Sequence, residues 1–200
     1  GRPSDNPLIL HISDYNQLNR IVNDIPDNAK KLMAAFWPGP LTIIFRKKPC
    51  VPDSVTGGLD TVAVRFPSNT AANRLIAAAD TPIAAPSANS SGKPSPTRAE
   101  HVYDDLNGKI DMIIDGGPCT VGVESTIVDV TGDIPCLLRP GGITLEMLES
   151  VLGRVDIDKA VTKMLSEGER PKAPGMKYKH YSPKAEVYLI KGEKNAVVNK

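Results

Sequence analysis

The stretch TVAVRF, residues 61–66, places large apolar side chains and smaller or charged ones at alternate positions. Successive side chains of a β-strand point to opposite faces, so this pattern predicts a strand with two unlike faces. The apolar face carries Val62, Val64 and Phe66, and the other face carries Thr61, Ala63 and Arg65. Two small residues and an arginine make a poor core face. We therefore expect this second face to form one wall of a polar cavity.

Further strands are predicted on both sides of this stretch. Short apolar or β-branched runs predict strands at residues 8–12, 41–45, 81–85 and 111–115. Residues 125–130 and 134–141 flank the turn Thr-Gly-Asp at 131–133, which predicts a β-hairpin.

Helices are predicted between these strands, and most of them have a recognisable cap or stop. They are a helix capped by Ser13, a helix over residues 27–36 that stops at the turn WPGP, a helix over residues 69–80, a helix with the capping box Thr97 and Glu100 that ends at Gly108, and a helix capped by Thr144 and closed by Gly153. Crossovers and a hairpin occur together, so the chain is predicted to form an α/β fold with a mixed sheet.

The composition of the chain changes near its end. Residues 159–184 are rich in Lys, Arg, Pro and Gly and have few large apolar side chains, which predicts a linker. The run AEVYLI at 185–190 predicts a new strand. We therefore expect a first domain over residues 1–158, and the start of a second, small α/β domain over residues 185–200.

Composition excludes several classes of protein. The 200 residues carry a net charge of +1, which gives no strong attraction to bulk nucleic acid or acidic membranes. Three dispersed cysteines are typical of a reducing cytosol, and the three histidines do not join them in metal-ligand spacing. No apolar run approaches the roughly 18 residues of a membrane span. We expect a cytoplasmic protein with no membrane segment and no metal ligands.

Two loops of small residues are candidate binding sites. The segment AAPSANSSGKPSPT, residues 84–97, runs from a predicted strand into a predicted helix, and free backbone N–H groups at such a junction bind anions. A phosphate or nucleotide site and an ordinary connecting loop both fit this pattern. The segment GGPCTVGVEST, residues 116–126, is a second such loop. The chain contains neither GxxxxGK[ST] nor GxGxxG.

Seven motifs follow one another along the chain: GRPSDNPLILHI, FWPGPLT, TVAVRFP, APSANSSGKPSPT, GVESTIVD, LRPGGIT and APGMKYKHYSP. Together they resemble the YrdC-type threonylcarbamoyl-AMP synthase family, in its long form with a linker and a small C-terminal domain. The resemblance implies a twisted, open mixed sheet with flanking helices around a basic cavity. It also implies that the family's domain begins upstream of Gly1, so that residues 1–158 would lack its N-terminal part.

The resemblance implies a nucleotidyltransferase reaction. L-Threonine, bicarbonate and ATP would give threonylcarbamoyl-AMP and pyrophosphate, with Mg²⁺ expected on the phosphates. A tRNA threonylcarbamoyl transferase complex would then use the product, and direct tRNA binding by this chain is not expected. The chain shows no Ser-His-Asp or Cys-His signature, in agreement with a reaction that needs positioning and charge stabilisation rather than a protein nucleophile.

The resemblance also implies which residues bind the substrates. L-Threonine is expected at His11, Arg65, Ala85 and Ser125, with Arg65 holding the carboxylate through paired donors. ATP is expected at Arg2, Asn6, Thr61, Ser87, Asn89, Ser95, Arg139, His180 and Tyr181. The last two residues belong to KYKHYSP, which is expected to fold back over the cavity and exclude water.

Two other functions remain as alternatives. One is a non-enzymatic RNA-binding module, but the net charge of +1 and the aromatic content of 4% speak against it. The other is a carbamoyl-adenylate-forming enzyme, which shares the domain. The motif HYSP and the strand predicted after it favour the threonine enzyme.

Overall fold

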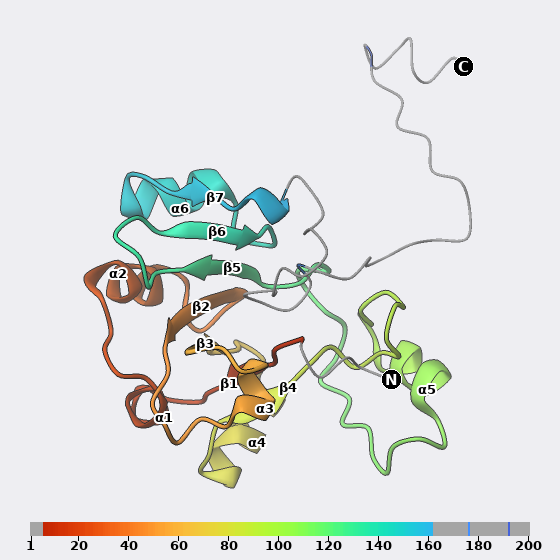
Figure 1. Cartoon of the computed structure of the whole chain (residues 1–200). Coiled ribbons are helices and arrows are strands. Elements are labelled where there is room, and N and C mark those ends of the chain that lie inside the picture. The colour runs from red at the N-terminus through yellow and green to blue at the C-terminus, as the bar shows by residue number, and fades with distance from the viewer. Residues whose placement is uncertain (1–5, 162–175, 177–191, 193–200) are drawn as a thin grey trace.

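A mixed sheet of seven strands forms the centre of the structure, a computed structural model that describes residues 6–161, 176 and 192 (Figure 1). Its strand order is β4-β1-β3-β2-β5-β6-β7. The strands are β1 (Ile9–His11), β2 (Leu41–Arg46), β3 (Thr61–Arg65), β4 (Ile83–Ala85), β5 (Thr126–Asp129), β6 (Cys136–Arg139) and β7 (Asp156–Ile157). Neighbours pair in parallel at β1–β3, β2–β5 and β6–β7, and antiparallel at β1–β4, β2–β3 and β5–β6. The predicted α/β fold with a mixed sheet is confirmed.

The strand predicted at residues 111–115 is wrong. Met112 and Ile114 are 76% and 60% exposed, and this segment pairs with no strand of the described sheet. A strand forms only where a neighbour satisfies its backbone N–H and C=O groups. The apolar run therefore stays outside the sheet, whereas the other predicted strands that fall on described residues are present.

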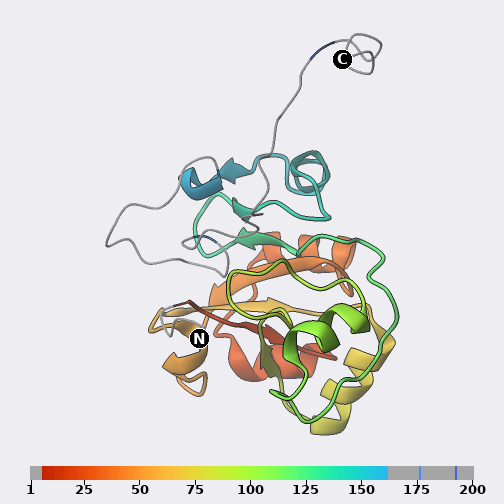
Figure 2. The ribbon, with the colours of Figure 1, turned by 90° about the vertical axis from the view of Figure 1, so that its right-hand side faces the viewer.

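Helices lie on both sides of this sheet. They are α1 (Tyr15–Ile21), α2 (Asp27–Phe36), α3 (Asp53–Thr56), α4 (Thr70–Ala79), α5 (Ala99–Leu106) and α6 (Leu145–Leu152), followed by the 3-10 turn η1 (Lys159–Val161). Helices α1, α2 and α6 cover one face, and α5 lies on the opposite side with the long loops that flank it (Figures 1 and 2). Long loops therefore cover part of the face opposite α1, α2 and α6, and binding residues often lie on loops.

The main core lies between the sheet and the helices of the first face. Leu18 of α1, Leu32 of α2 and Leu148 of α6 are 0% exposed, and they share one cluster with Ile43 and Val64 of the sheet. Burial of each such side chain stabilises the fold by about 1.5–3 kcal/mol. The apolar face predicted for residues 61–66 belongs to this cluster, so the prediction that it faces the core is confirmed.

The cap predicted for the first helix is wrong by one residue. The carboxylate of Asp14, not the hydroxyl of Ser13, accepts a hydrogen bond from the backbone N–H of Gln17 at 2.9 Å. The backbone N–H of Ser13 donates to the side chain of Gln17 instead, at 2.9 Å. Aspartate caps a helix at least as well as serine does, and its negative charge also favours the N-terminal end.

The capping box predicted for α5 is also wrong, whereas the cap predicted for α6 is confirmed. Arg98 occupies the N-cap of α5 without a side-chain cap hydrogen bond, and the hydroxyl of Thr97 lies 3.5 Å from Nδ1 of His101. At α6, the hydroxyl of Thr144 accepts a hydrogen bond from the backbone N–H of Met147 at 3.3 Å.

The last part of the chain is described only in places. Most of the predicted linker, residues 159–184, lies outside the described residues, and so does the strand predicted at 185–190. Within the part that the structure describes, no helix has the length and apolar character that crossing a bilayer requires.

Candidate functional site

Three turns that each contain glycine meet at one end of strands β2, β5 and β6. They are WPGP at residues 37–40, VGVES at 121–125 and RPGG at 139–142. The backbone N–H of Thr126 donates to the carbonyl of Pro40 at 3.0 Å, which joins the first turn to the second. A Cβ on Gly141 would lie 2.4 Å from the carbonyl oxygen of Glu124, so only glycine lets the third turn approach this closely. The ends of β2, β5 and β6 are thereby held together.

A row of paired positions crosses five strands at this edge. His11 of β1 pairs with Arg65 of β3, and Arg65 pairs with Thr42 of β2. Thr42 pairs with Ile127 of β5, which in turn pairs with Arg139 of β6. Paired residues of neighbouring strands project from the same face of a sheet. The four polar side chains among them therefore lie on the face opposite α1, α2 and α6. They are His11, Arg65, Thr42 and Arg139.

Ser125, immediately before β5, connects two members of this row. Its hydroxyl oxygen lies 2.7 Å from the hydroxyl of Thr42 and accepts a hydrogen bond from Nη2 of Arg139 at 3.1 Å. Its backbone carbonyl accepts two more, from Nε and Nη2 of Arg139, at 3.1 and 2.9 Å. We refer to His11, Arg65, Thr42, Ser125 and Arg139 together as the polar row.

Arg65 is held by one nitrogen and leaves the others available. Its Nε donates to the carbonyl of Gly39 at 3.1 Å, and a Cβ on Gly39 would lie 2.4 Å from the carbonyl oxygen of Phe36. Neither Nη atom bonds to a described residue. Burial lowers the pKa of Arg65 from its usual value, yet a guanidinium stays charged at neutral pH. Arg65 therefore offers paired donors to an anion.

His11, beside Arg65, is neutral at neutral pH. Burial, and to a smaller degree the charge of Arg65, lowers the pKa of its imidazole to about 4. Its Nδ1 is buried and has no hydrogen-bond partner among the described residues. Buried polar atoms of folded proteins almost always have a partner. His11 is thus suited to bind a polar group of a ligand.

Arg139 adds a second half-buried positive charge to the row. Burial lowers the pKa of Arg139 to about 10; the charge of Glu124 acts in the opposite direction, and that of Arg65 lowers it further. Both arginines are charged at neutral pH, and their mutual repulsion acts in a poorly solvated place. A bound anion would relieve this repulsion, so the row favours a negatively charged ligand.

A pocket of about 330 Å³ opens beside the His11 end of the polar row. His11, Arg65 and Ala85, three of the four residues predicted for L-threonine, line it. Its remaining walls are apolar: Pro67, Ala72, Leu75, Ile76, Ile83 and Pro86. Ser125, the fourth predicted residue, does not line this pocket but lies further along the polar row, where its hydroxyl contacts Thr42.

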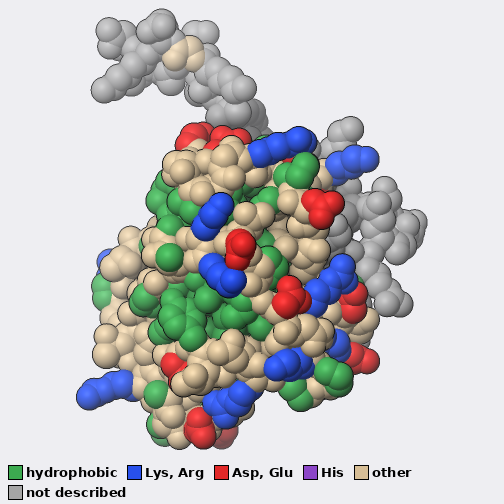
Figure 3. Space-filling model, turned by 90° about the vertical axis from the view of Figure 1, so that its left-hand side faces the viewer, with side chains coloured by type: hydrophobic (Ala, Val, Ile, Leu, Met, Phe, Trp, Pro, Cys, Tyr) green, Lys and Arg blue, Asp and Glu red, His purple; other side chains and the backbone are tan. Residues whose placement is uncertain are grey.

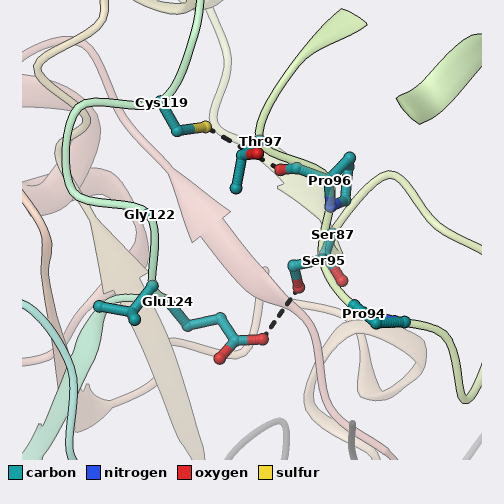
Figure 4. A pocket seen from close by; sticks show the side chains of 9 residues that line it. Ser87, Pro94, Ser95, Pro96, Thr97, Cys119, Gly122 and Glu124 are labelled. Carbon is teal, nitrogen blue, oxygen red and sulfur yellow. Dashed lines mark hydrogen bonds between the residues drawn. The ribbon is translucent and has the colours of Figure 1, made fainter. Parts of the chain in front are cut away.

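A second pocket, of about 380 Å³, lies between the loop after β4 and the loop before β5. Ser87 and Ser95, both predicted for ATP, line it with Cys119 and Glu124. The hydroxyl of Ser95 donates to Oε1 of Glu124 at 2.9 Å, and Figure 4 shows these two side chains pointing toward one another. This pocket therefore offers serine hydroxyls and one carboxylate to a ligand.

Asn89, also predicted for ATP, lines an adjoining pocket of about 260 Å³, which Ser95 borders as well. The Nδ2 of Asn89 donates to the carbonyls of Ser90 and Lys93, at 3.0 and 2.9 Å. Asp105 of α5 holds the same two residues, and Lys93 and Ser90 lower its pKa to about 2. The shape of the loop at residues 89–93 is thus set by hydrogen bonds within the loop and to Asp105 of α5.

The other residues predicted for ATP lie apart from the polar row or outside the described residues. Thr61 begins β3, which places it roughly 13 Å from Arg65 at the strand rise of about 3.3 Å per residue. Asn6 is buried just before β1, which runs parallel to β3, so Asn6 and Thr61 lie at the same end of these strands. Arg2, His180 and Tyr181 lie outside the described residues.

Thr42, Cys119 and Glu124 were not named as ligands from the sequence, although Cys119 and Glu124 belong to the loop 116–126 that was predicted as a candidate binding site. Thr42 lies in the polar row, and Cys119 and Glu124 line the second pocket. The sequence holds a signal for two of them, because Thr42 is the only polar residue of LTIIF and Glu124 is the only acidic residue of GVEST. A cysteine in a loop of small residues gives no comparable signal.

Met176 also lies on the face that carries the polar row. It belongs to the motif APGMKYKHYSP and is 8% exposed. It packs in a small cluster on this face, with Ile9, Ile44, Ala63, Ile127 and Leu138. The chain therefore returns at Met176 to the sheet face of the site.

Two family models match the chain one after the other. The model of the Sua5, YciO and YrdC proteins, described as "Telomere recombination", matches residues 1–141. The model described as "Threonylcarbamoyl-AMP synthase, C-terminal domain" matches residues 143–200.

Relatives of known name and structure agree with these matches. The threonylcarbamoyl-AMP synthase of Pyrococcus abyssi is 52% identical over 100% of this chain and 58% of its own length, and that of Bacillus subtilis is 53% identical over 96% and 55%. The crystal structure of P. abyssi Sua5 complexed with L-threonine superposes with a TM-score of 0.93 at 52% identity, over 100% of this chain and 58% of that one. The chain thus spans a little over half of the length of these relatives. On these matches the chain belongs to the Sua5/YciO/YrdC family, in the long form that carries the threonylcarbamoyl-AMP synthase C-terminal domain.

Proposed function

We propose that the protein is a threonylcarbamoyl-AMP synthase, which converts L-threonine, bicarbonate and ATP to threonylcarbamoyl-AMP and pyrophosphate. The observation that carries this proposal is the polar row, where two half-buried arginines, a neutral histidine and a serine hydroxyl lie side by side. The row suits a ligand that carries a carboxylate and a neutral polar group, as the carboxylate and hydroxyl of L-threonine do. The names of the relatives and the L-threonine in the P. abyssi structure support it.

L-Threonine is proposed to bind in the pocket of His11, Arg65 and Ala85. The Nη atoms of Arg65 would hold its carboxylate through two parallel hydrogen bonds. Neutral His11 would meet one of its polar groups, and the backbone of Ala85 and the hydroxyl of Ser125 would add contacts.

ATP is proposed to bind in the pocket of Ser87 and Ser95, with Arg139 directed to its phosphates. The serine hydroxyls can donate to phosphate oxygens, and Asn89 keeps the loop in shape from the adjoining pocket. Further contacts are proposed for the rest of the predicted residues: Arg2, Asn6, Thr61, His180 and Tyr181.

The residues present fit a magnesium ion that arrives with the nucleotide. Mg²⁺ in nucleotide sites takes one or two carboxylates together with phosphate oxygens and water. Glu124 is the carboxylate that lines the second pocket, and the described residues contain no group of three or more His, Cys, Asp or Glu that could hold a metal. When bound, the ion would neutralise phosphate charge.

The proposed reaction needs no nucleophile from the protein. The amine of threonine adds to the carbon of bicarbonate, and loss of water leaves a carbamate. A carbamate oxygen then attacks the α-phosphorus of ATP, and pyrophosphate leaves with the electrons of the broken P–O bond. Arg65 and Arg139 would align the two substrates and stabilise the negative charge that develops between them.

The product is a mixed anhydride, so a transferase must consume it. We infer that a tRNA threonylcarbamoyl transferase complex in the cytoplasm does so, and that this chain need not bind the tRNA itself.

The test measures pyrophosphate release by the full-length protein that contains this chain, with L-threonine and bicarbonate supplied or withheld. We expect release to require both compounds and threonylcarbamoyl-AMP to appear in mass spectra of the reaction. Release that is independent of L-threonine would contradict the proposal. AMP formation from carbamoyl phosphate in place of L-threonine would instead identify a carbamoyl-adenylate-forming enzyme.

A further inference from the structure

Asp105 of α5 carries a carboxylate that the proposed reaction does not use. Its side chain is only 9% exposed. Its Oδ2 accepts a hydrogen bond from the backbone N–H of Ser90, and its Oδ1 accepts from the hydroxyl of Ser90 at 3.0 Å and from Nζ of Lys93. A carboxylate withdrawn from water is unfavourable unless such bonds replace its hydration. The three bonds are therefore what make aspartate acceptable at this position.

The helix that carries Asp105 has little else to fix it. None of the eight residues of α5 is buried, so apolar packing contributes little to its attachment. The bonds of Asp105 to Ser90 and Lys93 join this helix to the loop after β4. The loop and α5 are thus held against one another largely by a single carboxylate.

Further hydrogen bonds continue from this carboxylate toward the second pocket. The Nδ2 of Asn89 donates to the carbonyls of Ser90 and Lys93, the two residues that Asp105 holds. The backbone N–H of Asn89 donates in turn to the carbonyl of Ser87 at 3.0 Å. Ser87 lines the second pocket, so bonded groups connect Asp105 to the wall of this pocket without a gap.

We propose that Asp105 is a positioning residue for ATP, which holds the loop so that Ser87 and Ser95 line the second pocket. Ser95 follows Lys93 by two residues, and it borders both the second pocket and the adjoining one. A loop that already has its binding shape loses less conformational freedom when a ligand binds, so the ligand binds more tightly. The inference rests on the proposed function for the identity of that ligand, ATP.

The same reasoning predicts which substrate depends on Asp105. Described residues of the loop border the pocket proposed for L-threonine only as far as Pro86, ahead of the part that Asp105 holds. When the loop takes other shapes, only the molecules that keep the binding shape take up ATP, and the apparent Kd rises accordingly. Loss of Asp105 should therefore weaken the binding of ATP and spare that of L-threonine.

The experiment measures the binding of ATP and of L-threonine to the full-length protein by isothermal titration calorimetry. We expect Asp105→Ala to weaken ATP binding about tenfold, as when one molecule in ten keeps the binding shape, and to leave L-threonine binding unchanged. Alanine favours helix, so α5 should persist in this variant. Asp105→Asn, which keeps an acceptor oxygen but not the charge, should have a smaller effect.

Hydrogen exchange separates a local role in the loop from a general loss of stability. In Asp105→Ala, the backbone amides of residues 88–93 should exchange faster, while those of the central strands β2 and β3 should keep their protection. Saturating ATP should restore the protection of the loop. Faster exchange in the loop and the central strands alike would show that Asp105 supports the fold in general, and it would contradict the inference.

Asp104 provides the matched control, because it lies next to Asp105 on α5 and borders the same adjoining pocket. It is exposed, and within the described part of the chain no hydrogen bond to its side chain is seen. Asp104→Ala removes the same charge without releasing the loop, so ATP binding and loop exchange should stay unchanged. If Asp104→Ala weakens ATP binding as much as Asp105→Ala does, charge is responsible and the inference is wrong.

Two further results would overturn the inference alone: unchanged ATP affinity in Asp105→Ala, or equal losses of affinity for ATP and L-threonine. If the unaltered protein binds no ATP, the proposed function fails and the inference fails with it. The titration of the unaltered protein thus distinguishes the two failures.

Discussion

Burial lowers the pKa of all three titratable residues of the polar row, but it leaves only the histidine neutral at neutral pH. It lowers the pKa of His11 to about 4 and that of Arg139 to about 10, and it lowers the pKa of Arg65 as well. The imidazole therefore loses its charge at neutral pH, whereas both guanidiniums keep theirs. The row holds two cations and one neutral ring, a combination that suits carboxylate and phosphate groups.

His11 should make the stability of the protein depend on pH. Its pKa is lowered to about 4 in the folded protein, while the unfolded chain has the ordinary value near 6.5, so protons bind the unfolded chain first as pH falls. The stability that neutral His11 contributes is present in full above about pH 6.5 and is lost as pH falls toward 4. We expect this group to lower the free energy of unfolding, measured in urea, by about 2 kcal/mol between pH 7 and pH 5.

Two histidine variants isolate this effect. His11→Gln should remove this part of the pH dependence, and His101→Gln, at an exposed histidine of α5, should leave it in place. If His11→Gln and the unaltered protein lose the same stability between these pH values, His11 does not cause it.

Arg65 should be required for its shape and not only for its charge. Lysine at this position cannot donate to the carbonyl of Gly39 and also hold a carboxylate with two parallel bonds. We expect Arg65→Lys to weaken L-threonine binding at least tenfold, about 1.4 kcal/mol or more, in calorimetric titrations of the full-length protein. Arg20→Lys, at an exposed arginine that pairs with Asp80, should bind normally. Normal binding by Arg65→Lys would show that Arg65 is not the carboxylate ligand.

At the scale of elements, the turns at the ends of β2, β5 and β6 hold the polar row in place. Gly39 shows this most directly, because its carbonyl accepts from Arg65 and an added Cβ would lie 2.4 Å from the carbonyl oxygen of Phe36. We expect Gly39→Ala to lower the free energy of unfolding by about 1–3 kcal/mol, as overpacking does, and to weaken L-threonine binding. Urea denaturation and calorimetry measure the two effects.

Gly132→Ala is the matched control for this substitution. A Cβ on Gly132 would meet its nearest neighbour, the carbonyl oxygen of Ile134, at an ordinary 3.9 Å. It should change neither quantity. If Gly39→Ala loses stability but binds L-threonine normally, the turn supports the fold without positioning Arg65.

The sequence was sufficient for those elements whose signals are local. The hydroxyl of Thr144 and the glycine at 153 bound α6 as predicted, and alternation placed Arg65 on the correct face. The choice between the neighbouring caps Ser13 and Asp14 depends on backbone angles that sequence does not show. Residues 111–115 failed for another reason, since a strand depends on a partner distant in sequence.

The polar row itself was only partly predictable, because it depends on which residues of neighbouring strands are paired in the sheet. The residues that meet in it come from four separate strands and a turn, and their pairing cannot be read from any one segment. Thr42 shows the consequence. Its place in an apolar run is visible in the sequence, but its contact with Ser125 appears only when β2 and β5 are aligned.

At the scale of the whole molecule, the two faces of the sheet have separate roles. The face with α1, α2 and α6 holds the large cluster, and the opposite face holds the polar row and the pockets. On the helix side, hydrophobic side chains gather near the middle and charges of both signs are scattered around them (Figure 3). Charges of both signs thus lie on this surface, whereas Arg65 and Arg139 place two positive charges side by side on the opposite face of the sheet.

Met176 should tie the C-terminal part of the chain to the face of the site. Its side chain is 8% exposed among Ile9, Ile44 and Ala63, whereas Met112 is 76% exposed. We expect Met176→Ala to leave a cavity and to lower the free energy of unfolding by about 2 kcal/mol or more. Met112→Ala, the matched control, should change it by less than about 0.5 kcal/mol.

Oxidation of the same two methionines tests this packing without any substitution. Exposed thioethers form sulfoxide faster than buried ones, so hydrogen peroxide should oxidise Met112 before Met176 in the native protein. Mass spectrometry of peptides measures both rates, and unfolding in urea should make them equal. Equal rates in the native protein would mean that Met176 leaves the sheet readily. The site would then lack the stable contact that Met176 makes with Ile9, Ile44 and Ala63 of the sheet.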